Sequence, residues 1–294
     1  MKTRLWNVKK ALKLYNTGVS IKTISKKIHR SYMTIYAAFR QYNCKFRSIG
    51  PIIKRSKQAI LFSKLNNEKT SYWLGMLVAD GHLASRKRKD NIITYQLVLN
   101  LSKIDISHIR KFHTFIGGHL GIRKNCVCVQ SQSSPDWNWL KQYGFTKGKT
   151  SRLKWPKIKN IRHFVRGFFD GDGWVTYQKC KRGNQWEGTA GFISISKSFL
   201  SRLQKWLYSH DVQASLSIYQ RAGSIGRIKN KIFIRKKNVY ILAIRQVDSF
   251  EKFHNLIYTD ASIYLNRKYN KFKQILQHRV NVQTITGRNV THRD

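Results

Sequence analysis

Two short segments of the sequence share a pattern that limits how the chain can fold. WLGMLVADG spans residues 73–81 and VRGFFDGDG spans residues 165–173. Each segment is largely apolar, which is typical of a buried helix, yet each has a glycine five residues before an aspartate. An inner glycine destabilises a helix by about 1 kcal/mol relative to alanine. It is useful where two backbones approach closely, so we expect Gly75 and Gly167 to form a helix–helix interface.

The two segments belong to a longer repeat. After the first segment come alternating strand residues at 93–102 and a helical pattern that begins near Asp105. After the second come a strand at 191–196 and another helical pattern. Ser102 and Ser196, which end the matched strands, are 94 residues apart, and the two aspartates are 92 apart. We therefore predict an α+β fold of two pseudo-symmetric halves, each with antiparallel hairpins.

The two aspartates, Asp80 and Asp172, end the two expected helices. We expect the glycines that follow them, Gly81 and Gly173, to take the left-handed conformation common after a helix. A carboxylate at a helix C-terminus is disfavoured by the helix dipole, and pairing the helices would also bring the two carboxylates together. A divalent cation removes both penalties. Two acids that hold metal over a polyanion suit phosphodiester hydrolysis, so we predict that both are catalytic metal ligands.

The composition indicates a polyanionic partner. The chain has 57 Lys and Arg against 13 Asp and Glu, a formal net charge of +44. Nucleic acid fits this charge best, because the basic residues are spread through strand-like segments and not along one membrane-binding amphipathic helix. No apolar stretch reaches the roughly 18 residues of a membrane span, and the N-terminus does not resemble a signal peptide. We expect an intracellular protein, in a bacterial or phage-infected cytoplasm or an organelle, with no membrane partner.

The first 67 residues carry sixteen Lys and Arg and no acid. Apolar spacing predicts three short helices, the second and third capped by Ser20 and Ser31. The third would bury Ile35 and Tyr42. This pattern resembles a helix-turn-helix, although an ordinary three-helix unit with solvated charges would fit it too. The residues that we expect to contact DNA here are Arg30, Ser31, Tyr32, Thr34, Tyr36 and Arg40.

The two repeated segments resemble the two copies of the namesake motif in the LAGLIDADG homing endonucleases. The resemblance covers about residues 68–275, and the segments at 143–156 and 256–272 are similar to those that close each half of such enzymes. It implies two αββαββα halves in one chain, whose sheets form a DNA-binding saddle. It also implies a long double-stranded DNA target, dependence on Mg²⁺ with Mn²⁺ or Ca²⁺ able to occupy the sites, and cleavage that leaves 3′ overhangs.

The resemblance assigns roles to individual residues. Lys149 and Lys268 are similar to basic residues that lie near the cleaved phosphates. Asn100 matches a polar residue that orients water, and its counterpart in the second half would be Ser194. Asp170, which has no acidic counterpart in the first motif, is expected to cap or pack. The metal positions by this resemblance are the carboxylates of Asp80 and Asp172 and the carbonyls of Ala79 and Gly171.

Residues that read DNA should alternate along the strands, with every second side chain facing a groove. For each of them, a non-specific phosphate contact is an equally good interpretation. The candidates on the strands and their loops are Arg86, Arg88, Asn100, Tyr177, Lys179, Lys181, Lys231, Arg235, Lys236 and Lys237.

The organisation that we expect has five regions. They are a helix-turn-helix module at 1–50, a basic linker at 51–67, a first LAGLIDADG half at 68–160, a second half at 161–280 and a tail at 281–294. We expect a monomer that acts on double-stranded DNA. Two alternatives stay open, namely an RNA maturase that assists splicing of its own intron and a catalytically inactive DNA-binding regulator.

Overall fold

The computed structural model shows two compact units, Met1–Ile52 and Ile53–Asp294, each with its own hydrophobic core. No helix among the described residues is long and apolar enough to cross a membrane. The residues that the structure describes are 7–17, 19–44, 62, 67–87, 93–132, 138–141, 144–145, 153–179, 186–228 and 231–286.

The N-terminal unit contains three helices, α1 (Val8–Asn16), α2 (Ile21–Ile28) and α3 (Tyr32–Gln41). The hydroxyls of Ser20 and Ser31 accept hydrogen bonds from the backbone of the first turns of α2 and α3, so both predicted caps are confirmed. The prediction that Tyr42 is buried is wrong. It lies just after the last helical residue of α3 and is 52% exposed, because the buried stripe of α3 ends at Phe39.

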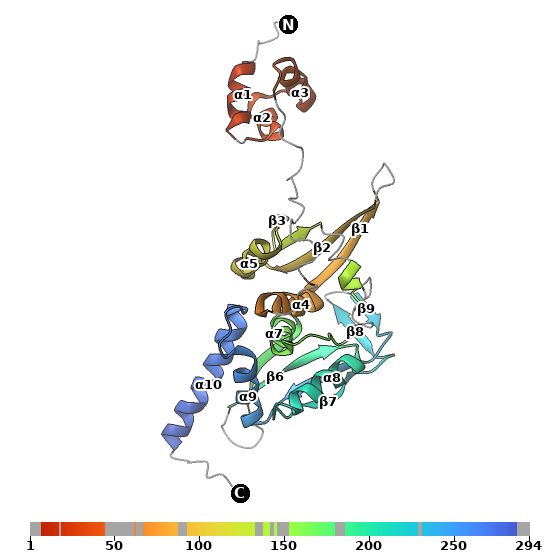
Figure 1. Ribbon diagram of the computed structural model, residues 1–294, viewed down its shortest axis with the longest axis vertical. Coiled ribbons are helices and arrows are strands. Elements are labelled where there is room, and N and C mark those ends of the chain that lie inside the picture. Colours follow the sequence, from red (N-terminus) through yellow and green to blue (C-terminus); the bar gives the residue numbers. More distant parts are fainter. Residues whose placement is uncertain are drawn as a thin grey trace. The chain divides into compact units, whose positions relative to one another are not determined.

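The larger unit is built from two halves with the same order of elements (Figure 1). The first half contains α4 (Glu68–Asp80), β1 (Gly81–Lys87), β2 (Ile93–Ser102), a short 3₁₀ helix (Lys103–Asp105), α5 (Ile106–Ile116), β3 (His119–Ile122) and β4 (Cys126–Ser131). The second contains α7 (Ile161–Asp172), β5 (Gly173–Lys179), β6 (Trp186–Ser194), α8 (Lys197–Tyr208), β7 (Ser215–Gln220), β8 (Ile225–Ile228), β9 (Lys231–Ile234), β10 (Val239–Ile244), α9 (Val247–Tyr258) and α10 (Asn266–Thr286).

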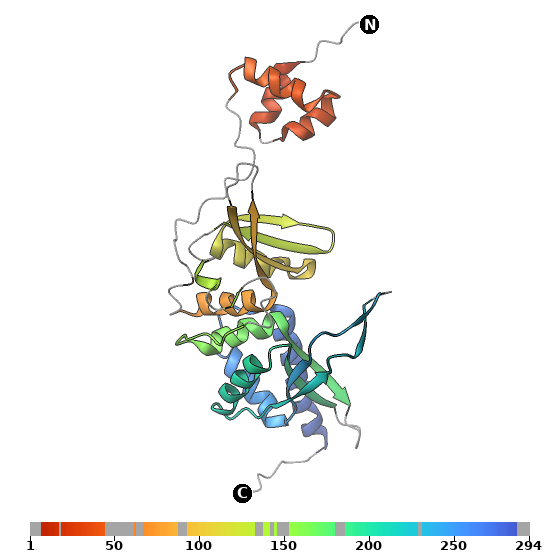
Figure 2. The ribbon, with the colours of Figure 1, turned by 90° about the vertical axis from the view of Figure 1, so that its right-hand side faces the viewer.

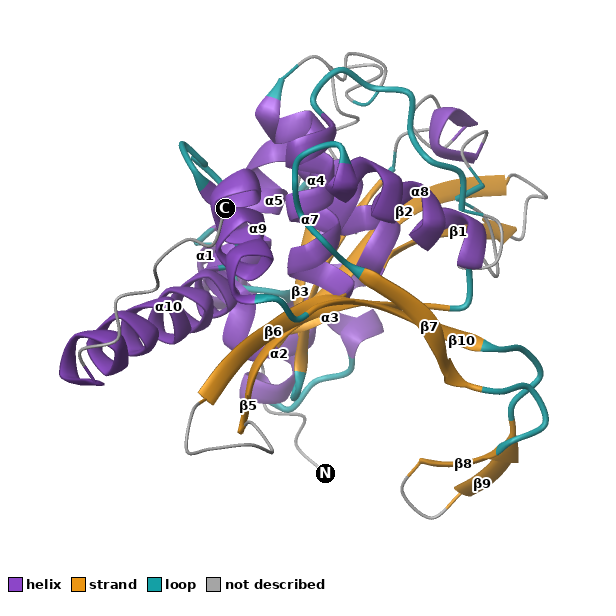
Figure 3. Cartoon of the chain, turned by 90° about the horizontal axis from the view of Figure 1, so that it is seen from below, coloured by secondary structure: helices purple, strands orange, loops and turns teal. Residues whose placement is uncertain are grey.

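The two main sheets have matching topology. Their strand orders are β1-β2-β4-β3 and β5-β6-β10-β7, and all pairs given for them are antiparallel. Helix α5 contacts the first sheet, and α8 and α9 contact the second (Figure 3). We call the opposite face of each sheet its open face. The predicted fold class, α+β with two pseudo-symmetric halves, is confirmed.

Helices α4 and α7 lie side by side between the two sheets and make the most extensive contact of any two elements (Figure 2). A methyl carbon on Gly75 would lie 2.0 Å from the carbonyl oxygen of Phe164, and one on Gly167 would lie 1.9 Å from that of Tyr72. Only glycine permits such an approach. The structure therefore places both glycines at the helix–helix interface.

The two glycines after the aspartates do not take the conformation that we predicted. Gly81 has φ −80° and Gly173 has φ −72°, which is extended and not left-handed backbone. Each helix runs directly into the first strand of its sheet. A methyl carbon on Gly81 would lie 2.7 Å from the carbonyl oxygen of Leu77, and one on Gly173 would lie 2.5 Å from that of Phe169. Crowding at the helix–strand junction, not left-handed geometry, explains these glycines.

The ends of the larger unit differ in part from the predicted boundaries. Helix α10 continues to Thr286, so the boundary at 280 falls inside a helix. Most of the predicted linker lies outside the described residues. Phe62 is described, and it is fully buried with its ring 6.1 Å from that of Phe115 on α5. The other region boundaries stay predictions.

Candidate active site

The aspartates Asp80 and Asp172 occupy equivalent positions at the ends of α4 and α7. Each is the last residue of its helix, each is exposed, and each is followed by the first strand of its sheet. The two helix ends meet, because a methyl carbon on Gly171 would lie 2.3 Å from Cβ of Ala79 and 3.3 Å from a carboxylate oxygen of Asp80. Both carboxylates therefore face solvent at one end of the interface, where two negative helix termini converge.

Lys268, at the start of α10, lies beside this pair. It is only 7% exposed, and its ammonium group donates hydrogen bonds to the carbonyl oxygens of Phe169 at 2.6 Å, Gly171 at 3.2 Å and Gly173. Burial lowers the pKa of Lys268 to about 8, while the negative charges of nearby acids, Asp80 and Asp172 among them, oppose that shift. Lys268 thus satisfies the free carbonyls at the end of α7, within the electrostatic field of both aspartates.

The resemblance predicted that Lys268 lies near a cleaved phosphate. The structure places its ammonium group close to the aspartates but directs it into the protein, toward backbone carbonyls. The carbonyl of Gly171, which we expected to assist metal binding, already accepts one hydrogen bond from it. A carbonyl oxygen has two lone pairs, so this bond leaves capacity for a second partner.

Asp170 is structural. It is 1% exposed, and its carboxylate accepts hydrogen bonds from the hydroxyls of Tyr72 at 2.8 Å and Tyr258 at 2.7 Å and from the backbone N–H of Leu265 at 2.7 Å. Burial raises its pKa, and these three hydrogen bonds oppose the shift. Asp170 therefore joins α4, α7 and the segment that leads into α10. This matches the interpretation that it caps or packs.

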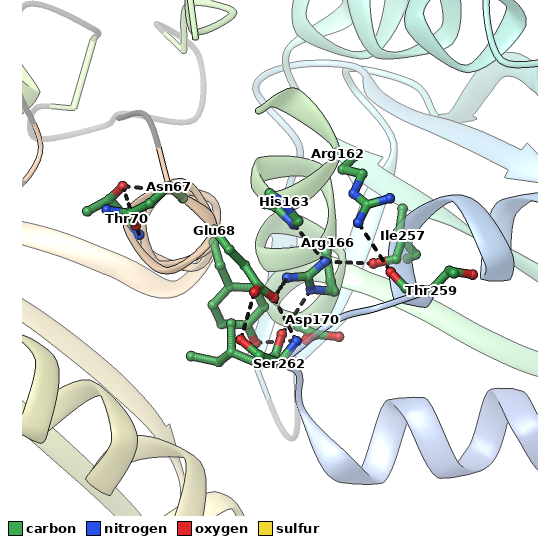
Figure 4. Close-up of polar contacts among 12 residues, drawn as sticks. Asn67, Glu68, Thr70, Arg162, His163, Arg166, Asp170, Ile257, Thr259 and Ser262 are labelled. Carbon is green, nitrogen blue, oxygen red and sulfur yellow. Dashed lines mark hydrogen bonds and ion pairs between the residues drawn. The ribbon is translucent and has the colours of Figure 1, made fainter. Parts of the chain in front are cut away.

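A second polar group on α7 links the two halves, and the sequence did not reveal it. Arg166 is fully buried, and its guanidinium lies 2.5 Å from a carboxylate oxygen of Glu68 at the start of α4 (Figure 4). It also donates to the carbonyl oxygens of Ile263 at 2.9 Å and Ile257 at 2.8 Å. Glu68 in turn accepts hydrogen bonds from the backbone and hydroxyl of Ser262. These contacts fix the segment after α9 against the helix pair.

Glu68 should make stability depend on acid. Burial raises its pKa, but the hydrogen bonds from Ser262 and the charge of Arg166 outweigh burial, so the net pKa lies below 4.5. A lowered pKa stabilises the fold above the unfolded value, and that stability is lost as the pH falls below 4.5 through the folded value. We expect Glu68→Gln to lower the free energy of unfolding at pH 7 by about 2 kcal/mol.

The measurement is urea denaturation between pH 7 and pH 3.5. The variant should lose less stability on acidification than the unchanged protein, since this titration is gone. Glu251→Gln, at an exposed position on α9, is the matched control and should keep the original slope. An unchanged slope in Glu68→Gln would contradict the assignment.

The residues at the helix ends fit a hard divalent cation. Both aspartates supply exposed oxygen ligands, the type that Mg²⁺, Mn²⁺ and Ca²⁺ prefer. Within the described part of the chain, no group of three or more His, Cys, Asp and Glu is placed to hold a metal with side chains alone. The other ligands would have to be carbonyl oxygens, such as that of Ala79, water or a bound phosphate. That donor set is typical of a site completed by a nucleic acid.

The open faces contain some of the predicted DNA-reading residues. Asn100 is exposed on β2 and pairs with Cys128, while the buried Leu99 and Leu101 on either side face the core. The register shows that Asn100 corresponds to Ile193 in the second half and not to Ser194, because Gly81 pairs with Leu99 and Gly173 pairs with Phe192. The polar position on the open face therefore has an apolar counterpart.

Two other predictions on the strands need correction. Tyr177 is partly buried against the core, and its hydroxyl donates to the carbonyl of Gln274 on α10 at 3.3 Å, so it lies on the helix-covered face of its sheet and the predicted DNA contact is wrong. The guanidinium of Arg235 donates to the side chain of Gln220 at 2.7 Å and the carbonyl of Ile225 at 2.7 Å. It supports a hairpin in this state.

The remaining predicted residues are placed as follows. Lys236 and Lys237 are exposed between β9 and β10. In the N-terminal unit, Arg40 is exposed, Arg30 is half-buried, and the stacked rings of Tyr32 and Tyr36 lie 6.1 Å apart. Ser31 and Thr34 are exposed and bond to each other at the start of α3. Lys149, Arg88 and Lys181 lie outside the described residues, as do the side chains of Arg86, Lys179 and Lys231.

Comparison with known proteins agrees with this architecture. Residues 159–258 match the family model described as a LAGLIDADG-like domain. The uncharacterised protein MJ0398 of Methanocaldococcus jannaschii is 24% identical over 214 residues, which cover 70% of this chain and 71% of that protein.

Solved structures give the same result for the fold. The LAGLIDADG meganuclease I-AabMI, solved bound to uncleaved DNA, has a TM-score of 0.50 at 15% identity, with 75% of this chain and 92% of that chain covered. The LAGLIDADG homing endonuclease I-GzeII, solved in complex with a DNA target, has a TM-score of 0.49 at 12% identity, with 76% and 94% covered. Residues 159–258 therefore form a LAGLIDADG-like domain, and the chain has the fold of the LAGLIDADG meganucleases.

Proposed function

We propose that this protein is a site-specific DNA endonuclease that hydrolyses one phosphodiester bond in each strand with the help of divalent metal ions, chiefly Mg²⁺, and leaves 3′ overhangs. One observation carries the proposal. Two helices, packed backbone to backbone through Gly75 and Gly167, bring Asp80 and Asp172 together at one exposed end. This placement is unfavourable for the fold by itself, and metal binding over a phosphate gives it a purpose.

The residues around the helix ends have distinct tasks. Asp80 and Asp172 would hold the metal, with the carbonyl of Ala79 and the remaining capacity of the Gly171 carbonyl beside them. The metal would supply Lewis-acid stabilisation of the phosphate and an activated water. Lys268 acts as a positioning residue, because its buried ammonium group holds the end of α7 and places positive charge near both acids. Lys149 is proposed as the corresponding basic residue of the first half.

Double-stranded DNA is the proposed partner. The formal charge of +44 supplies sequence-independent affinity, and exposed residues such as Asn100, Lys236 and Lys237 are available to contact the duplex. Both acids come from one chain, so a monomer contains a complete site. We propose that the protein acts inside a cell or organelle that contains its DNA target.

The test is direct cleavage. Purified protein is incubated with Mg²⁺ and a plasmid in which the sequences that flank its gene are joined, and the products are mapped on both strands. We expect a double-strand break with 3′ overhangs that disappears when EDTA replaces Mg²⁺. Two other outcomes would overturn the proposal. Tight binding without cleavage would support a regulator, and stimulated splicing of a host intron without cleavage would support an RNA maturase.

The N-terminal unit is proposed to extend the DNA footprint. Deletion of Met1–Ile52, which forms a separate compact unit, should weaken DNA affinity about tenfold or more at physiological salt. Each lost phosphate contact reduces the slope of log affinity against log salt by about 0.9, so loss of three contacts should reduce it by about 3. Fluorescence anisotropy at several salt concentrations measures both quantities. Cleavage at high protein concentration should persist, and unchanged affinity and slope would contradict a DNA-binding role.

A further inference from the structure

The ribbon formed by β8 and β9 is a feature that the helix-end site does not explain. It lies between β7 and β10 in sequence but forms its own two-stranded sheet beyond the ends of those strands (Figure 3). Ile225 pairs with Ile234 and Arg227 pairs with Ile232, so these four residues share one face of the ribbon. Gly226 pairs with Phe233, and both lie on the other face.

The ribbon is held in place at its base. Arg235 bonds to Gln220 on β7, and its guanidinium lies 5.4 Å from the ring of Phe233. The ring of Phe233 covers Gly226, where a methyl carbon would lie 2.5 Å from it. Backbone bonds between Arg235 and both Gly223 and Ser224 close the connection. The face with Phe233 is therefore filled by the protein's own side chains.

The opposite face is apolar and exposed. Ile225 is 74% exposed, Ile232 is 64% exposed and Ile234 is 68% exposed, and Arg227 beside them is also exposed. We call Ile225, Ile232 and Ile234 the isoleucine face. Clustered exposed isoleucines are unfavourable in water, and such a patch usually marks a contact surface. The structure of this one chain leaves the surface uncovered.

The charge around the isoleucine face indicates what covers it. Residues 221–238 include seven Lys and Arg and no Asp or Glu. A polyanion is therefore the matching partner. A two-stranded ribbon fits the major groove of B-DNA, which is about 12 Å wide, with basic side chains near the phosphates and the other face toward the base edges. The apolar group exposed on those edges is the 5-methyl group of thymine.

We propose that the isoleucine face lies in the major groove at one end of the DNA target and selects thymine through its methyl groups. This inference rests on the DNA-binding part of the proposed function and does not require cleavage. It also predicts asymmetry. In the first half, β3 and β4 are joined by the short turn Arg123–Asn125, so the matching position has no ribbon. Only one end of the target should show the preference.

The test uses binding in EDTA, so that cleavage has no influence. A randomised DNA duplex library is selected for binding to the full chain, and bound sequences are read. We expect thymines enriched at one end of the selected sites. The same duplexes are then made with deoxyuridine, which lacks only the methyl group, in place of those thymines. Affinity should fall about fourfold for each methyl group that the isoleucine face contacts.

A variant assigns the effect to the ribbon. Ile232→Thr with Ile234→Thr keeps β-branched residues at exposed positions, so the fold should be unaffected. It should bind thymine and deoxyuridine duplexes almost equally. Ile104→Thr is the matched control, because Ile104 is 75% exposed in the first half and lies outside the ribbon. It should keep the full preference for thymine.

Three results would overturn the inference. The unchanged protein binds both duplexes equally, the ribbon variant keeps the thymine preference, or the variant loses binding to vesicles of anionic phospholipid while its DNA selectivity is unchanged. The last would assign the isoleucine face to a membrane surface. None of them bears on cleavage, which fails or succeeds separately in the Mg²⁺ assay.

Discussion

Replacing Asp80 or Asp172 with asparagine is expected to lower the rate of double-strand cleavage about a thousandfold and to leave DNA binding nearly intact. Metal-assisted stabilisation of charge is worth several kcal/mol, and each 1.4 kcal/mol corresponds to a factor of ten in rate. The same substitutions should slightly raise the free energy of unfolding, by some tenths of a kcal/mol, because each removes a negative charge from a helix C-terminus. Opposite changes in activity and stability distinguish a metal ligand from a structural residue.

Single-turnover cleavage, DNA binding in EDTA and urea denaturation measure these three effects. Asp211→Asn is the matched control, since Asp211 is an exposed aspartate just after α8, far in sequence from both motifs. It should leave all three unchanged. A variant at Asp80 or Asp172 that cuts both strands at the original rate would contradict the assignment.

Gly75→Ala and Gly167→Ala are expected to destabilise the larger unit by about 3 kcal/mol or more. Helix propensity alone predicts the opposite, because alanine favours an exposed helix by about 1 kcal/mol over glycine. At these positions the added methyl carbon would lie about 2 Å from a carbonyl oxygen of the facing helix, so the helices must separate. Overpacking of this kind costs 1–3 kcal/mol or more, roughly, and separation also moves the two aspartates apart. Cleavage should therefore fall with stability.

Urea denaturation and cleavage assays check this result. Gly223→Ala is an informative control, because nothing lies within 4 Å of the added carbon and only the positive φ of 82° opposes it. That strain is worth about 1 kcal/mol. If Gly75→Ala is as stable as the unchanged protein, the close helix contact is wrong.

The repeated motifs predicted the architecture because the physical requirement is local. A glycine at a fixed place in an apolar helix indicates close helix packing whatever the rest of the chain does, and Gly75 and Gly167 lie where that requirement places them. The trailing glycines were interpreted wrongly for the same reason. A glycine after a helix is usually left-handed, and only the direct entry into β1 and β5 shows that crowding selects it here.

The asymmetry between the halves was beyond the sequence pattern. Arg166 and Asp170 occupy positions where the first motif has Leu74 and Val78, and their partners lie about 90 to 100 residues away, on α4 and in the segment that follows α9. No local spacing reveals such pairs. The direction of the Lys268 side chain was equally hidden, since a lysine in a basic chain looks exposed until the fold places it under the end of α7.

The most direct measurement of the central claim is the position of the metal. Crystals of the full chain with a DNA target are grown with Mn²⁺, and its anomalous scattering locates the ions. We predict Mn²⁺ bound by the carboxylates of Asp80 and Asp172, with phosphate oxygens of the two strands completing the ligands. The Asp80→Asn variant should lose or weaken that signal. Ions bound elsewhere, with both carboxylates free of metal in the DNA complex, would contradict the account.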